Sequence, residues 1–175
     1  MIIDEIFSSV IGKFCWDAEK GYGSFLTFEF GEPHLDISER FRSKDGFREK
    51  LRSVAVHGDW HLWIYLCDWQ IYSHDTLKVS SQSSKRDIMR AMGRLNGQIL
   101  SQVEVHPSCA TTFLFELGDR LETLPNVIEY GQDSEQWLLY EHSGKVFTLR
   151  ADQKYSYQPG NTPKDDETWQ PMIFS

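Results

Sequence analysis

The sequence predicts an α+β fold, an antiparallel β-rich single domain built from two similar helix-plus-β-sheet units. Three observations predict it. Apolar and polar residues alternate in several short segments, turn residues separate those segments, and two other segments show helical spacing. We expect one domain over residues 1–175, with units at about 1–82 and 83–160 and a C-terminal extension at 161–175.

A short amphipathic helix opens each predicted unit. Its apolar residues lie three and four positions apart and therefore share one face. They are Ile2, Ile3, Ile6, Phe7 and Val10 in the first helix, and Ile88, Met89, Met92 and Leu95 in the second. Ser84 with Asp87 three residues later approximates a capping signature, and Asn96-Gly97 marks a stop.

Strands follow each helix. Residues 24–30 alternate apolar and polar side chains, as do residues 113–117, and turns at Gly31 and Gly118 then lead back into short strands, which predicts two hairpins. Further turns separate residues 60–66 from 69–73, and 136–140 from 146–150. Ser143-Gly144, in the last of these turns, gives a strong hairpin signal.

The two halves also resemble each other directly. Phe28-Glu29-Phe30-Gly31-Glu32 returns as Phe115-Glu116-Leu117-Gly118-Asp119, and residues 60–75 align without a gap onto residues 137–152. The pattern predicts an internal repeat with pseudo-symmetric packing. The alternative is a chance resemblance between two β-rich stretches.

Charge and cysteine content limit the partners and the compartment. A net charge of −8 disfavours nonspecific binding to nucleic acid or to an anionic membrane, and it is compatible with a basic protein partner. Cys15, Cys67 and Cys109 form no CxxC pair, which predicts reduced thiols. No apolar run approaches membrane-spanning length, and we expect a soluble cytoplasmic protein. No stretch matches a cofactor motif, so we expect no cofactor.

The candidate metal site is the segment from His57 to His61. On an extended strand His57, Asp59 and His61 would share one face, and imidazole and carboxylate groups are metal ligands. Gly58-Asp59 is also a common turn dipeptide, and a turn would scatter the three side chains.

The candidate binding segment is the basic run from Glu39 to Arg52. It contains Arg40, Arg42, Lys44, Arg48, Lys50 and Arg52 and has no counterpart in the second half. A charged insertion of this kind favours an anion or an acidic partner. The alternative is a solvated segment with a short helix anchored by Phe47 and Leu51.

Catalytic signals are weak. The chain contains no nucleophile elbow, phosphate-binding glycine loop or zinc-protease helix motif, and Pro107-Ser108 between His106 and Cys109 suits a turn better than a catalytic pair. Trp60 and Trp63 point to opposite faces of a strand, so core packing is favoured over one stacking platform.

These features together favour a non-catalytic protein-binding module, for example an immunity-like protein that masks a basic surface. The competing hypothesis is a small-ligand-binding or enzymatic protein with a pocket between the two units, lined by His57, Asp59, His61 and His74. A homodimer formed through an exposed edge strand is also compatible with the pattern.

Overall fold

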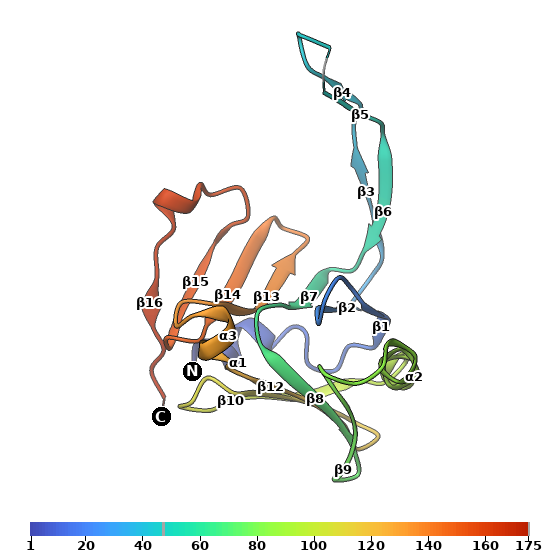
Figure 1. Cartoon of the computed structure of the whole chain (residues 1–175), viewed down its shortest axis with the longest axis vertical. Helices are drawn as coiled ribbons and strands as arrows, with labels where there is room; N and C mark the ends of the chain where they lie inside the picture. Colours follow the sequence, from blue (N-terminus) through green and yellow to red (C-terminus); the bar gives the residue numbers. More distant parts are fainter. Residues whose placement is uncertain (47, 175) are drawn as a thin grey trace.

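The structure is a computed structural model that describes residues 1–46 and 48–174. It contains two antiparallel sheets that share one hydrophobic core and a long β-ribbon that projects away from them (Figure 1). The predicted class, an antiparallel β-rich α+β domain, is confirmed.

The larger sheet has seven strands in the order β1-β2-β7-β13-β14-β15-β16. Their bounds are Cys15–Lys20 for β1, Leu26–Phe30 for β2, Trp60–Ile64 for β7, Glu135–Glu141 for β13, Lys145–Arg150 for β14, Lys154–Pro159 for β15 and Gln170–Pro171 for β16.

The smaller sheet has five strands in the order β10-β11-β12-β8-β9. Their bounds are Leu100–Val105 for β10, Thr111–Phe115 for β11, Asp119–Leu124 for β12, Asp68–Ser73 for β8 and Thr76–Ser80 for β9.

Short helices complete the domain: α1 (Ile2–Phe7), α2 (Lys85–Leu95), α3 (Val127–Tyr130) and the 3₁₀ turn η1 (Lys164–Asp166). Ser84 caps α2 as predicted, because its side chain accepts a hydrogen bond from the backbone N–H of Asp87. Among the described residues, no helix is long and apolar enough to cross a membrane.

Aromatic side chains from α1 and both sheets meet in the core. The ring of Trp137 on β13 lies 5.8 Å from the rings of both Phe7 and Phe113, measured between centroids. Its indole N–H donates a hydrogen bond of 2.9 Å to the hydroxyl of Thr111, so burial of this polar group costs little. The three cysteines are free and buried, and burial raises the pKa of Cys15 to about 12.

The described residues between 34 and 57 form the projecting ribbon, and we call the segment 34–57 the arm. Strand β3 (His34–Ser38) pairs with β6 (Ser53–His57), and β4 (Phe41–Arg42) pairs with β5 (Glu49–Lys50) farther out. The sequence predicted that the strand after Gly31 would fold back onto the strand before it. Instead β2 pairs with β1 and β7, and β3 leaves the sheet (Figure 1).

The alternative of a short helix in residues 39–52 does not match the described part of this segment, which is strand and turn. Leu51, one of its two expected anchors, is 70% exposed. Phe47, the other anchor, lies outside the described residues.

The internal repeat is not confirmed. In the two aligned segments, β13 and β14 form a hairpin in the larger sheet, whereas the chain after β7 crosses to the smaller sheet and becomes β8. Likewise β11 forms a hairpin with β12, whereas β2 forms none with β3. The repeat therefore stays a prediction from sequence.

The C-terminal extension packs back onto the larger sheet. Strand β16 pairs with β15, Met172 is buried, and the guanidinium of Arg150 lies 4.5 Å from the ring centre of Trp169. These contacts hold the segment against the sheet.

Candidate functional site

Four of the six histidines gather with two carboxylates where the arm joins the larger sheet. Glu29, His57 and His61 form one group, which we call the Glu29 cluster. Oε1 of Glu29 lies 3.0 Å from Nδ1 of His57 and 2.5 Å from Nδ1 of His61. Glu29 on β2 is the direct cross-strand neighbour of His61 on β7, and the arm supplies His57.

Glycine at position 58 makes this arrangement possible. A Cβ atom on Gly58 would lie 2.2 Å from the carbonyl oxygen of Phe30, so a larger residue would force the chain out of place. In this position the N–H of Gly58 donates a 2.8 Å hydrogen bond to Oε2 of Glu29. One oxygen of the carboxylate is thus held by the backbone and the other faces the two imidazoles.

Glu29 is only 3% exposed, and two opposing effects act on the pKa of its carboxyl group. Burial alone raises the pKa of this carboxyl, but hydrogen bonds from His61, from the Gly58 N–H and from His57 outweigh burial, and the pKa falls below its usual value. The cluster therefore places a buried carboxyl group with a lowered pKa beside two imidazoles.

A second group, the Asp59 cluster, consists of Asp59, His34 and His142. Oδ1 of Asp59 lies 2.7 Å from Nε2 of His34, and Oδ2 accepts a 2.8 Å hydrogen bond from the N–H of Glu32. These hydrogen bonds, that from Glu32 first, lower the pKa of Asp59. The ring of His34 stacks on that of His142 at 3.7 Å, so the cluster ties the arm to the β13–β14 turn.

A cavity of about 470 Å³ opens beside the Glu29 cluster, between the root of the arm and the outer face of the larger sheet. Its lining includes aromatic, imidazole and carboxylate groups: Trp63, Tyr140, His57, His61, His142 and Asp36. The volume suits a small molecule. This cavity lies outside the space between the two sheets, which the core side chains fill.

The structure therefore divides the three residues of the predicted metal site. His57 and His61 come together, but Asp59 turns to His34. Glu29 lies beside them in place of the expected Asp59, and the sequence did not predict this residue as part of the site. Its signal was its polar position in the alternating strand β2, but its proximity to His61 depends on a pairing between distant segments. His74, the fourth polar residue expected in the pocket, lies in the β8–β9 turn against Gly118.

The arm has one apolar face. Leu35 pairs with Val56 and Ile37 with Val54 across β3 and β6, so their four side chains share one side of the ribbon. Their exposed fractions are 67%, 45%, 56% and 58% in the same order. The opposite side carries Asp36, Ala55 and two serines. The arm is thus an amphipathic ribbon whose apolar side faces solvent.

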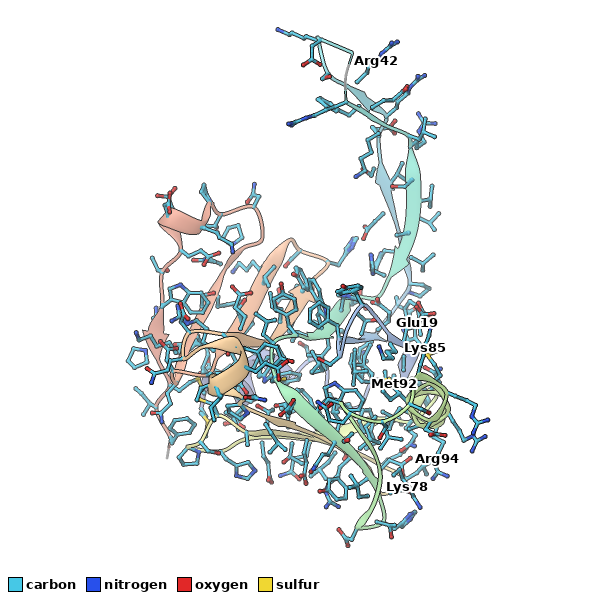
Figure 2. The ribbon with its side chains drawn as sticks, viewed as in Figure 1. Glu19, Arg42, Lys78, Lys85, Met92 and Arg94 are labelled. Carbon is cyan, nitrogen blue, oxygen red and sulfur yellow. The ribbon has the colours of Figure 1, made fainter. Side chains whose placement is uncertain are left out.

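The candidate basic residues all lie in the outer part of the arm; Figure 2 shows Arg42 near its far end. Arg40 pairs with Glu49, and Arg52 pairs with Glu39. The arm holds six of the 18 Lys and Arg residues and four of the 26 Asp and Glu residues, a net charge of +2. The rest of the chain then carries −10.

Comparisons with known proteins give no relative from which a function could be transferred. No family model matches the chain, and no curated protein and no solved structure is significantly similar to it. The features of this chain that bear on function are the arm, the cavity and the Glu29 cluster.

Proposed function

We propose that the chain is a non-catalytic protein-binding module and that the arm is its docking element. The observation that carries the proposal is the row of Leu35, Ile37, Val54 and Val56, which is exposed on a ribbon that projects from the domain (Figure 1). Contiguous exposed apolar groups of this kind mark interaction surfaces in soluble proteins.

Strand pairing gives a second argument for a partner. A two-stranded ribbon without a covering layer is at best marginally stable in water, and both of its outer edges offer unpaired backbone groups. A partner that covers the apolar side or pairs with an edge would stabilise the arm. In this proposal the arm is therefore more stable in a complex than in the free chain.

We infer that the partner is a second copy of this chain, and the distribution of charge supports this choice. The arm carries +2 and the remaining surface −10, so the arm of one copy complements the body of another. This arrangement unites the two sequence-based expectations, an acidic partner for residues 40–52 and a basic partner for the acidic chain. Reciprocal docking of two arms would form a closed two-fold dimer.

Sedimentation velocity over a wide concentration range tests this proposal. We expect the wild-type chain to dimerise, and we expect added salt to weaken the dimer because the charges at its surface are screened. The double variant Ile37→Ser/Val54→Ser removes part of the apolar side, and Arg42→Glu/Arg48→Glu reverses charge near the tip; both should stay monomeric.

The matched control is Ile128→Ser, because Ile128 is 98% exposed but lies on the body. It should dimerise like the wild type. A wild-type chain that stays monomeric at every concentration would disprove docking to a second copy and return the immunity-like alternative, in which the acidic body masks a different basic protein.

The cavity supports a second candidate function, the binding of a small molecule at the root of the arm. Trp63 and Tyr140 give it aromatic walls, and His57 and His61 give it polar groups. Ligand screening by the shift in melting temperature tests this candidate. A genuine ligand should stabilise the wild type and lose its effect in Trp63→Ala.

A further inference from the structure

The Glu29 cluster has the composition and spacing of a transition-metal site. We propose that Glu29, His57 and His61 bind one divalent transition-metal ion, with Zn²⁺ as the best match. One ligand atom from each side chain lies within 4.8 Å of the other two. Zinc bonds to nitrogen and oxygen are about 2.0–2.2 Å long, so atoms this close can reach one shared ion by small side-chain movements.

The ligand types select the metal. Two imidazoles and one carboxylate suit Zn²⁺ and the neighbouring transition metals, whereas Mg²⁺ and Ca²⁺ prefer oxygen ligands. Three protein ligands leave one position of a tetrahedral zinc site open. Because His57 and His61 also line the cavity, that position is available to water or to a molecule bound there.

The surroundings of Glu29 favour a site over an incidental hydrogen-bond group. The Gly58 N–H holds Oε2 at 2.8 Å, which orients Oε1 towards both imidazoles, as outer hydrogen bonds orient ligands in metal sites. Within residues 1–46 and 48–174, this is the one group in which three metal-binding side chains come so close together. In the nearby Asp59 cluster, His34 stacks face to face on His142.

A metal at this position would join the arm to the body. His57 is the last residue of β6 in the arm, whereas Glu29 and His61 belong to strands of the larger sheet. The ion would therefore fix the root of the arm relative to the sheet. This inference is independent of the docking proposal, because Glu29 and His61 belong to the larger sheet and His57 lies on the side of the arm opposite the apolar one.

Isothermal titration calorimetry with Zn²⁺ on the untagged full-length chain, with native mass spectrometry for stoichiometry, tests the site. We expect one Zn²⁺ per chain and no comparable binding of Mg²⁺. His61→Ala and Glu29→Gln should weaken Zn²⁺ binding by at least about a hundredfold, because loss of a direct ligand should exceed the effect of losing an outer partner.

His142→Ala is the matched control, since His142 also lines the cavity but belongs to the Asp59 cluster. It should bind Zn²⁺ like the wild type. Circular dichroism reports whether each variant folds. If His61→Ala unfolds, His57→Ala tests the site in its place, because the side chain of His57 is 39% exposed. The proposal would be overturned if the wild type took up no Zn²⁺. Unchanged Zn²⁺ binding in folded His61→Ala or His57→Ala would also overturn it, as would an equal loss of Zn²⁺ binding in His142→Ala.

Discussion

The arm and the two-sheet body use the same kind of strand in opposite ways. In β2, Leu26, Phe28 and Phe30 are fully buried between the sheets, whereas Leu35 and Ile37 in β3 are mostly exposed. Each of the two strands carries apolar side chains on one of its faces. The difference is that β2 has a second layer opposite it and β3 does not, so alternation identifies an apolar face without identifying what covers it.

Apolar side chains therefore contribute to folding stability in the body and, in our proposal, to binding in the arm. Burial of apolar surface contributes about 25 cal/mol per Å², and in the body the chain itself supplies the covering groups. In the arm the same contribution is still available to a partner. Substitutions of similar chemistry should therefore have large effects on unfolding in the body and small ones in the arm.

The largest loss should come from Trp137→Ala in the body. Trp137 is fully buried among Phe7, Phe113 and Phe147, and its removal leaves a cavity and an unpaired Thr111 hydroxyl. We expect a loss of about 3–5 kcal/mol in the free energy of unfolding, measured by urea denaturation. Tyr22→Ala, at a side chain 89% exposed, is the control and should change little. Equal losses in the two variants would contradict the assignment of the core.

Gly58→Ala should have the next largest effect, because it acts where the two regions join. The added Cβ would collide with the Phe30 carbonyl, and relief requires movement of the arm root. We expect a loss of about 1–3 kcal/mol from overpacking, again by urea denaturation. Rapid proteolysis within residues 34–57 should accompany this loss. A variant as stable and as resistant as the wild type would show that the close approach does not exist in solution.

How far the sequence predicts this molecule follows the same division. The fold class, α2 with its Ser84 cap, and the hairpins β11–β12 and β13–β14 depend on local patterns, and local patterns are what a sequence displays. The departure of β3 from the sheet depends on the pairing of β2 with β7, which lies about thirty residues away along the chain. The same pairing brings Glu29 to His61. The sequence therefore predicted His57 and His61 as members of the candidate site, but not Glu29.

Gly93→Ala should produce a smaller change of opposite sign. Gly93 is exposed in the last turn of α2, and a Cβ there would lie within 4 Å of no atom beyond its chain neighbours and the backbone of this helix. Alanine has the higher helix propensity, so we expect a gain of up to about 1 kcal/mol, seen as a higher melting temperature. Destabilisation would mean that α2 packs more closely on this side. Together with Gly58→Ala, this variant tests whether local packing determines if a glycine-to-alanine substitution stabilises or destabilises the chain.

The smallest effect on unfolding should come from Ile37→Ser/Val54→Ser in dilute, monomeric protein. Both side chains are exposed by more than half, so we expect a change within about 0.5 kcal/mol for each substitution. At high concentration, where arms dock in our proposal, the wild type should become more stable than this variant, since association stabilises the folded chain by mass action. The melting temperature at several concentrations measures both effects. A loss comparable to that of Trp137→Ala in the dilute protein would mean that the apolar side of the arm is already covered within one chain, and the contrast between arm and body would then fail.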